Sequence, residues 1–453
     1  VNPDGTPQPE MAEIKKIYQP IQMRARDLTK AEVELTNWYD FLSSEDWLAA
    51  DWRLVADGKT LQQGALENFT LAPREKKVLA LPLRAFEAAP ATEYFLEVRF
   101  ALKTNPPWAD AGHEIAWEQF KLPVALTAQL PPPPAAPALT LDDAADKITV
   151  IGPAFSATID RATGLLASLK SGDAELIDTP LTPHFWRAPI DNDRGNKMWS
   201  TTIVNRWNPP PGFWRHAHKS WKLQSLEVTQ PSPGRVVVTT WGTITLDPSM
   251  VGKQRITYTI LGSGDVLFDT QFLPPAARNA PELPRFGTQV IVREGFDRLS
   301  WFGKGPHETY WDRQDARVGL YRGTVAEQYF PYMRPQETGN KEAVRWLALT
   351  DKSGRGLLAV GQPLLSANAT HQQTEDLFSA TQEEPFYQFQ IPDRKTITLN
   401  LDLKQRGLGG DTSWGALPHE EFRLNPWPMS LRYRLRVLTG GEDLVALAKQ
   451  PVE

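Results

Sequence analysis

The feature that most constrains the fold of this chain is an alternation of apolar and polar side chains with a period of two. In residues 431–437, Leu, Tyr, Leu and Val alternate with three arginines, and residues 94–100 and 397–403 repeat the pattern. A period of two places successive side chains on opposite faces of a β-strand, whereas a helix would spread them around its circumference. The sequence therefore predicts strands that have one apolar face and one mostly polar face.

Turn sequences join several of these stretches. Asp57-Gly58 follows an apolar run and accepts the positive φ of a tight hairpin turn. Gly262 to Asp265 separates two further alternating runs, and residues 155–159 are expected to pair with residues 165–169. Only residues 11–18 favour a helix, and no alternation of strand and helix indicates a parallel sheet. The expected fold class is all-β.

Proline marks a domain boundary. Four consecutive prolines at 131–134 donate no ladder hydrogen bonds and favour stiff polyproline II, so residues 127–140 are predicted to be a linker. Residues 20–126 hold about seven short strand candidates, which is typical of an immunoglobulin-like β-sandwich. Residues 141–453 form one long β region, which indicates a large double sheet. Residues 1–19 belong to neither part and are interpreted as a tail.

Composition excludes several classes of function. Because 49 Lys+Arg stand against 54 Asp+Glu, with a net charge of −5, no basic footprint for nucleic acid is expected. The chain has no cysteine, which excludes a disulfide framework, a thiol nucleophile and a Cys-ligated metal. No apolar run approaches the ~20 residues of a membrane helix, and the first residues lack the features of a signal peptide.

Three stretches carry candidate chemistry. Residues 184–195, 301–313 and 407–414 each mix flat aromatic rings with short polar groups on irregular backbone. Proteins bind sugars in this way, because ring faces cover apolar C–H patches while carboxylates and amides bond the hydroxyls. The stretches therefore favour a sugar-binding or sugar-processing β protein, and a structural β module that supports a partner is the other class.

Each stretch also has a purely structural interpretation. Arg187 with Asp191 or Asp193 would then be an ion pair that closes a turn. The glycines of 407–410 would serve only a turn, and Trp414 would belong to the core. On residue spacing alone, these interpretations compete with the functional ones.

The histidines offer little evidence of a metal or catalytic site. His307 beside Glu308 can be read as a loop histidine, and neighbours on one strand would point to opposite faces. His216 and His218 would share a face of a strand, but no carboxylate follows nearby. We therefore expect no metal ligand among them.

Several motifs, taken in order, resemble the C-terminal portion (domains four and five) of β-galactosidases of glycoside hydrolase family 2. Residues 187–193 read Arg-Ala-Pro-Ile-Asp-Asn-Asp, which is similar to a signature of that family. The other similar segments are residues 109–119, 303–313, 331–339 and 409–414. Residues 2–9 also resemble the segment that leaves the catalytic barrel.

The resemblance implies both the fold and a missing part. Residues 20–126 would be the immunoglobulin-like fourth domain, and residues 141–453 a small-chain-type β-super-sandwich related to galactose mutarotases. In the family, a (β/α)₈ barrel precedes both domains and carries the two catalytic glutamates, whereas this sequence has no barrel-like alternation of strand and helix. We therefore expect no catalytic residue in this chain and no hydrolysis by it alone.

The resemblance also implies roles for a few residues. Trp414 matches the tryptophan that stacks on the aglycone of the substrate at the mouth of the active site. Gly195 and Asn196 match the start of a mobile loop beside the active site, although the sequence departs from better-known members just beyond Gly195. Asp411 and Ser413 are candidate members of the same site.

The implied partners are a β-galactoside such as lactose, a catalytic barrel domain or large subunit, and further copies in a homo-oligomer. No nucleic acid and no membrane are expected, and the compartment, cytoplasmic or periplasmic, stays open. No cofactor is expected in this chain, since the family binds Mg²⁺ and Na⁺ mainly through the barrel. The alternative is a stand-alone mutarotase-like aldose epimerase, with His307 and Glu308 as acid and base, or a carbohydrate-binding module.

Overall fold

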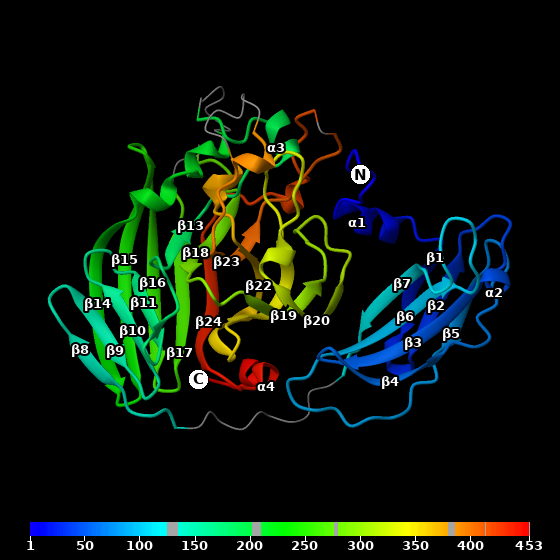
Figure 1. Ribbon diagram of the computed structural model, residues 1–453, viewed down its shortest axis with the longest axis horizontal. Coiled ribbons are helices and arrows are strands. Elements are labelled where there is room, and N and C mark those ends of the chain that lie inside the picture. Colours follow the sequence, from blue (N-terminus) through cyan, green and yellow to red (C-terminus); the bar gives the residue numbers. More distant parts are fainter. Residues whose placement is uncertain (125–134, 202–209, 276–279, 379–385, 413, 453) are drawn as a thin grey trace.

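The fold is all-β. The structure, a computed structural model, describes residues 1–124, 135–201, 210–275, 280–378, 386–412 and 414–452 (Figure 1). Strands hold 46% of the residues and helices 11%, and every strand pairing within the described ranges is antiparallel. The predicted fold class is confirmed. No helix in these ranges has the length and apolar character needed to cross a membrane.

A small sandwich follows the tail, on one side of the molecule (Figure 1). A three-stranded sheet in the order β1-β2-β5 faces a four-stranded sheet in the order β4-β3-β6-β7. Inward side chains such as Val33, Leu54 and Leu96 are fully buried between the two sheets. The elements are α1 (Glu10–Ile17), β1 (Ile21–Asp27), η1 (Leu28–Lys30), β2 (Glu32–Asn37), α2 (Ser44–Trp47), β3 (Leu48–Ala56), β4 (Lys59–Ala65), β5 (Lys76–Ala80), β6 (Tyr94–Leu102) and β7 (Glu114–Lys121).

The larger part combines a five-stranded sheet with a twelve-stranded one. The first has the order β12-β11-β10-β9-β8. The second runs β13-β18-β23-β22-β24-β17-β16-β15-β14, and three further strands branch from β22: β21 pairs with β22, β19 with β21, and β20 with β19. Residues from both sheets, including Val150, Tyr258 and Tyr433, share one buried core.

The elements of this larger part are β8 (Thr140–Asp143), β9 (Lys147–Ile151), β10 (Phe155–Asp160), β11 (Leu166–Ser171), β12 (Ala174–Glu175), β13 (Thr182–His184), α3 (Asp191–Gly195), η2 (Pro211–Trp214), η3 (Ala217–Ser220), β14 (Lys222–Ser232), β15 (Arg235–Asp247), β16 (Met250–Leu261), β17 (Asp265–Leu273), β18 (Arg285–Val292), β19 (Arg298–Gly305), β20 (Arg317–Thr324), η4 (Ala326–Gln328), β21 (Lys341–Thr350), β22 (Arg355–Thr370), η5 (Thr374–Leu377), η6 (Gln388–Gln390), β23 (Ile397–Gln405), η7 (Glu420–Phe422), β24 (Met429–Thr439) and α4 (Leu444–Lys449).

The local sequence signals correspond to observed elements. Helix α1 covers residues 10–17, and the predicted hairpins join β3 to β4, β10 to β11 and β16 to β17. Most of the predicted linker, residues 125–134, lies outside the described residues, and β8 begins at its last residue, Thr140. His218 lies in the short 3₁₀ turn η3, and His216 directly precedes that turn, so neither histidine is on a strand.

The expected polar face of β23 is not exposed to water. Thr398, Asn400 and Asp402 alternate with leucines as predicted, yet each is at most 3% exposed. Strand β23 lies inside the large sheet between β18 and β22, and it is covered on both faces. The predicted strand and its two faces are present, but the alternation identifies the faces without indicating what covers them.

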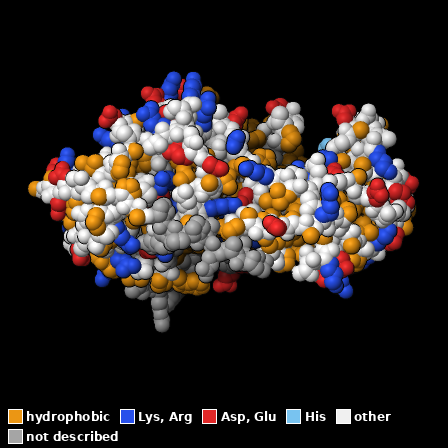
Figure 2. All heavy atoms as spheres, turned by 90° about the horizontal axis from the view of Figure 1, so that it is seen from below, with side chains coloured by type: hydrophobic (Ala, Val, Ile, Leu, Met, Phe, Trp, Pro, Cys, Tyr) orange, Lys and Arg blue, Asp and Glu red, His pale blue; other side chains and the backbone are white. Residues whose placement is uncertain are grey.

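The sandwich contacts the larger part through polar groups. The amide of Gln119 makes two hydrogen bonds with the backbone of Val318 on the edge strand β20, at 2.8 and 2.9 Å. Arg345 bonds both carboxylate oxygens of Glu93, at 2.5 and 2.9 Å. Although burial opposes ionisation of Glu93, hydrogen bonds from Arg345 and Lys121 lower its pKa to about 2. Elsewhere, acidic and basic side chains are interspersed over the face shown in Figure 2.

Replacing Gly58 by alanine tests the contact between the β3–β4 turn and β20. Gly58 has a φ of +83°, and an added Cβ would lie 2.6 Å from Cβ of Leu320. We expect the free energy of unfolding to fall by about 2–4 kcal/mol, from the left-handed backbone and the overlap together. The matched control is Gly112→Ala, because Gly112 has a φ of +85° but no atom within 4 Å of the added Cβ. Equal losses in urea denaturation of both variants would contradict this contact.

Candidate functional site

A single cleft gathers the segments that the sequence singled out. Its volume is about 640 Å³, and its walls come from residues 8–14, 190–192, 308–313, 332–337 and 408–410. The last four ranges belong to the three aromatic and polar stretches and to the motif at 331–339. Segments more than 200 residues apart in the sequence therefore form one concave surface, which is the usual form of a small-molecule site.

A buried ion pair between Arg187 and Asp193 holds the stretch at 184–195 in place. Phe185 and Trp186 enter the core, and Arg187 is fully buried between its carboxylate partner and a neighbouring loop. Nη2 of Arg187 donates to both oxygens of Asp193, at 3.2 and 3.1 Å, and to the carbonyl of Gly407 at 3.1 Å. Nη1 donates to the carbonyl of Arg406. The structural ion pair proposed for Arg187 exists with Asp193, and it also ties this stretch to the glycine-rich loop.

Asp193 also determines where helix α3 begins. Its carboxylate accepts a hydrogen bond from the backbone N–H of Ile190 at 3.1 Å, which fixes the chain as it enters the helix. Asp191, the first residue of α3, lines the cleft and exchanges two hydrogen bonds with the amide of Gln336, at 3.1 and 3.2 Å. The motif at 331–339 is thereby bound to the motif at 187–193.

Glu308 is the centre of a second cluster in the cleft wall. Its carboxylate accepts from the hydroxyl of Tyr332 at 2.5 Å, from the hydroxyl of Thr338 at 3.1 Å and from the N–H of Gly339 at 2.7 Å. Arg313 pairs with the same carboxylate. Burial and the charge of Glu308 raise the pKa of Tyr332 well above its usual range. Strand β19 ends at Gly305, so His307 and Glu308 lie on a loop rather than on a strand.

The glycine-rich loop is anchored at its start by two side chains. Asp312 accepts hydrogen bonds from the N–H groups of Leu408 and Gly409, at 2.6 and 3.1 Å. Asn192 donates to the carbonyl of Leu408 at 3.3 Å. An added Cβ at Gly409 would lie 2.6 Å from Nδ2 of Asn192, so a larger residue there would have to displace the Asn192 amide.

The structure brings most of the predicted site residues together. The end of the glycine-rich loop lies against the end of α3. A Cβ added at Gly415, which has a φ of +112°, would lie 2.9 Å from the carbonyl oxygen of Gly195 and 3.7 Å from N of Asn196. Trp414 is therefore next to Gly195 and Asn196, and its side chain is 91% exposed. The alternative interpretation of Trp414 as a core residue is wrong.

Of the other two predicted residues, Asp411 and Ser413, the structure describes only Asp411. Asp411 is exposed and accepts a hydrogen bond from, or pairs with, Nε2 of His419 at 2.8 Å. That hydrogen bond, followed by the charge of Asp411, raises the pKa of His419. Ser413 lies outside the described residues.

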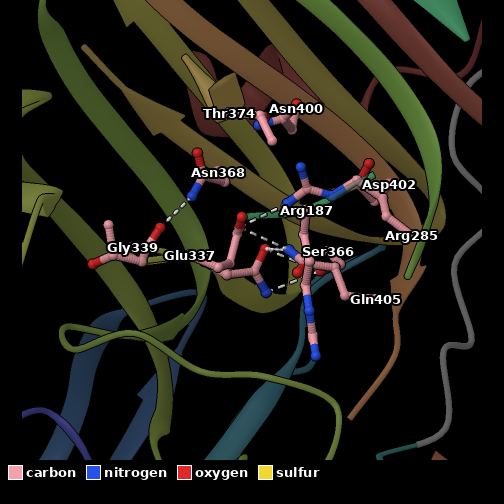
Figure 3. A network of polar contacts seen from close by, with 12 residues as sticks. Arg187, Arg285, Glu337, Gly339, Ser366, Asn368, Thr374, Asn400, Asp402 and Gln405 are labelled. Carbon is pink, nitrogen blue, oxygen red and sulfur yellow. Dashed lines mark hydrogen bonds and ion pairs between the residues drawn. The ribbon is translucent and has the colours of Figure 1, made fainter. Parts of the chain in front are cut away.

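Beneath the cleft lies a buried cluster of arginine, carboxylate and amide side chains, part of which is shown in Figure 3. Arg285 donates to Glu337 at 2.7 Å, and its Nε lies 3.0 Å from Asp402. Gln405 donates to Glu337 at 3.4 Å, and Glu342 accepts from Ser366 at 2.7 Å. Glu337 also lines the cleft. The cluster thus supports the floor of the cleft from the strands β18, β22 and β23.

Burial changes the protonation of two of these carboxyls. It raises the pKa of Glu342 to about 7, against the opposing hydrogen bonds of Ser366 and Asn340. Burial likewise raises the pKa of Asp402 to about 8, and Arg285 only partly opposes this. Within the part of the chain that is described, neither oxygen of Asp402 accepts a hydrogen bond. The guanidinium of Arg285 thus forms ion pairs with two carboxyls, at 2.7 Å from Glu337 and 3.0 Å from Asp402, but donates a hydrogen bond only to Glu337 among the two.

Sequence reasoning missed part of the site. Gln8, Glu10, Glu13 and Ile14 line the cleft, although the tail carried no recognisable site signal. Glu308, Asp312 and Asn192 stood within the quoted motifs, but nothing in their spacing indicated which groups they would contact. Across the described ranges, no group of three or more His, Cys, Asp or Glu side chains is placed to hold a metal ion.

Comparison with known proteins identifies relatives of both parts. The family described as "Beta galactosidase small chain" matches residues 151–436, and "Beta-galactosidase, domain 4" matches residues 33–123. A β-galactosidase of Priestia megaterium is 34% identical over 93% of this chain, and one of Lactobacillus delbrueckii subsp. bulgaricus is 31% identical over 93%. The chain spans only 39% of the length of each of these relatives and corresponds to their C-terminal portion.

Solved structures with a similar arrangement include epimerases. Galactose 1-epimerase from Lactobacillus acidophilus NCFM aligns with 67% of this chain and 98% of its own, with a TM-score of 0.34 and 10% identity. A GalM/aldose epimerase homologue from C. elegans aligns with 67% of this chain and 100% of its own, with a TM-score of 0.33 and 10% identity.

Proposed function

Because the chain belongs to the β-galactosidase small-chain family, we propose that it forms the non-catalytic side of the active site of a retaining β-galactosidase of glycoside hydrolase family 2. In this proposal, the cleft between the glycine-rich loop, helix α3 and the tail receives the aglycone side of a β-galactoside such as lactose. A catalytic (β/α)₈ barrel, as a domain or a large subunit, supplies the chemistry and holds any Mg²⁺ or Na⁺.

The observation that carries the proposal is the position of Trp414. Its indole is 91% exposed at the end of a loop whose backbone is fixed by Arg187, Asp312 and Asn192. Exposing a large aromatic ring on a well-anchored loop favours stacking against a ligand, since sugars present apolar C–H faces to such rings. A tryptophan needed only for packing would be buried.

The carboxylates of the cleft support the absence of a catalytic pair. A retaining glycosidase needs a nucleophile and an acid/base about 5–5.5 Å apart across the anomeric carbon. Here Glu308 accepts three hydrogen bonds besides its ion pair, Glu337 is paired with Arg285, and Asp312 accepts two backbone N–H groups. Such carboxylates are engaged in holding the walls together. The same engagement of Glu308 disfavours the alternative in which His307 and Glu308 catalyse epimerisation.

The surface beside the cleft supports a partner. Helix α1 and the residue that follows it expose three large apolar side chains, Ile14, Ile17 and Tyr18, by 42%, 57% and 81%, and Ile14 also lines the cleft. An apolar stripe at the mouth of a site is suited to contact with another folded part. We propose that the barrel covers this stripe and that the assembled protein is a homo-oligomer.

The first test is the activity of residues 1–453 alone. We expect the purified chain to release no nitrophenol from a nitrophenyl β-galactoside, because the nucleophile and the acid/base would both be absent. Turnover that follows the chain through purification, and that a contaminating hydrolase does not explain, would refute the proposal.

The second test is Trp414→Ala in a β-galactosidase that carries this chain together with its barrel. Loss of stacking is expected to raise the KM for lactose about two- to tenfold, while kcat on an activated aryl galactoside changes little. Trp38→Ala is the matched control, since Trp38 is 53% exposed on the sandwich. An unchanged KM for lactose would rule out the aglycone role of Trp414.

A further inference from the structure

An exposed pair of aromatic rings lies outside the cleft on residues 386–392. The rings of Tyr387 and Phe389 are nearly parallel, with an angle of 9° between their planes and 5.5 Å between their centroids. Tyr387 is 49% exposed and Phe389 is 84% exposed. Each ring therefore partly covers the other, and a broad aromatic surface stays open to solvent. We call these two residues the ring pair.

The ring pair is held in place by the turn that carries it. The N–H of Tyr387 donates to the side chain of Gln390 at 2.8 Å, and the N–H of Gln390 donates to the carbonyl of Tyr387 at 3.0 Å. These reciprocal bonds close the 3₁₀ turn η6. Because the backbone is fixed, little conformational entropy remains to be lost when a ligand lies on the rings.

The same turn is bound to two segments that line the cleft. Gln388, between the two rings, accepts a hydrogen bond from the hydroxyl of Tyr329 at 2.7 Å and donates to the carbonyl of Tyr332. Ile391 packs against a buried cluster of Leu377, Phe378 and Ala188, the last of which belongs to the motif at 187–193. Tyr332 and the 64% exposed Met333 line the cleft itself. The turn that carries the ring pair is thus attached, through Gln388 and Ile391, to segments that lead into the wall of the cleft.

The chemistry of the segment favours a neutral ligand. Residues 386–392 read Phe-Tyr-Gln-Phe-Gln-Ile-Pro and carry no charged side chain. Aromatic faces with amide and phenol groups at their edges match a sugar, whose apolar C–H face stacks while its hydroxyls bond at the rim. An anionic or cationic ligand would find no opposite charge on these residues.

We propose that the ring pair is a distal sugar subsite, which binds the outer units of a neutral β-linked galacto-oligosaccharide that extends from the cleft. This inference rests on the proposed function, since the cleft must hold the nearer units of the same chain. It adds a substrate class: oligosaccharides of three or more units are bound more tightly than disaccharides.

The test is calorimetric titration of residues 1–453 with a β-linked galactotetraose and, separately, with the disaccharide. The tetraose is expected to bind more tightly than the disaccharide, and Phe389→Ala is expected to weaken tetraose binding about three- to tenfold without changing disaccharide binding. Phe41→Ala, which removes a 92% exposed ring on the sandwich, is the control and is expected to change neither affinity. Phe389 and Phe41 are both exposed, so the two variants are expected to fold.

Three results would overturn the proposal: equal affinities of the original chain for both sugars, no detectable binding of the tetraose, or equal tetraose affinities of the original chain and Phe389→Ala.

Sedimentation on the same samples adds one more outcome. Self-association that Phe389→Ala abolishes, without an effect on sugar affinity, would assign the ring pair to contact between copies. Trp414→Ala separates this proposal from the previous one, because it is expected to weaken both sugars equally. If Trp414→Ala changes neither sugar affinity while Phe389→Ala weakens tetraose binding, the aglycone role fails while the distal subsite stands.

Discussion

Replacing Arg187 by alanine is expected to lower the free energy of unfolding by about 3–5 kcal/mol, because it leaves the buried carboxylate of Asp193 and two backbone carbonyls without their principal donor. Arg187 and Asp193 are 0% and 1% exposed. Arg406, 3.2 Å from Asp193, would keep part of the compensation. Urea denaturation followed by tryptophan fluorescence measures the loss.

The control for this variant is Arg194→Ala in the same helix. Arg194 lies 4.0 Å from Asp191, and the two side chains are 39% and 64% exposed, so its removal is expected to cost at most about 0.5 kcal/mol. A loss below 1 kcal/mol for Arg187→Ala would show that burial of this pair adds nothing to stability. Arg187→Lys is expected to recover only part of the loss, since one ammonium cannot bond Asp193 and both carbonyls in the same geometry.

The second large effect concerns pH. We compare the free energy of unfolding of Asp402→Asn with that of the original chain. The difference is expected to shift in favour of the variant by about 1–2 kcal/mol between pH 6.5 and pH 8. The pKa of Asp402 is raised to about 8 by burial, above the ordinary value of 3.8. A carboxyl with a raised pKa in the folded state contributes stability that is complete below pH 4 and is lost as the pH rises through 8. Asparagine does not titrate, so the variant escapes this loss.

Comparing the two proteins removes the titrating groups that do not interact with Asp402. Glu342, whose pKa is raised to about 7, does interact with Asp402, so the comparison measures the two carboxyls together. Burial lowers the pKa of His184, which makes folding more favourable as the pH rises through 6.5. Burial also lowers the pKa of Lys341, to about 8. Both groups titrate in the original chain and in Asp402→Asn alike, and their contributions cancel in the difference.

Asp269→Asn is the surface control for Asp402→Asn. Asp269 is 32% exposed and pairs with Arg432 at 3.1 Å, and its substitution is expected to change stability by the same amount at both pH values. If Asp402→Asn behaved in the same way, Asp402 would already be ionised at pH 6.5, and Arg285 would serve both carboxylates fully.

Much of the local structure was predictable, because it depends on neighbours in the sequence. The turn at Asp57-Gly58 requires a positive φ at Gly58, and that requirement is visible in the residue types alone. The alternation in residues 431–437 corresponds to strand β24 for the same reason. The motifs also identified Trp414 as a candidate, and its exposure is compatible with that role.

The contacts between motifs were not predictable from spacing. Asp312 and Leu408 are 96 positions apart, and Glu308 and Gly339 are 31 apart. Their hydrogen bonds exist because antiparallel pairing carries the intervening strands back to one end of the large sheet. Glu10 and Ile14 reach the cleft from the tail, which is held there by long-range contacts: Glu10 lies 3.8 Å from Arg313, and Glu13 accepts a hydrogen bond from the N–H of Asp315 at 2.9 Å.

The strands with two distinct faces could be recognised from residue order, because the alternation of side chains along a strand is a local property of extended backbone. What each face meets depends on how the sheets pack against each other. Asn400 and Asp402 have the alternation of a solvated face but lie in the interior, since their strand is covered on both faces. Trp414, an indole suited to a core, is 91% exposed on a loop whose start is held by Arg187 and Asp312. Burial depends on what folds over a residue, and no residue carries that information alone.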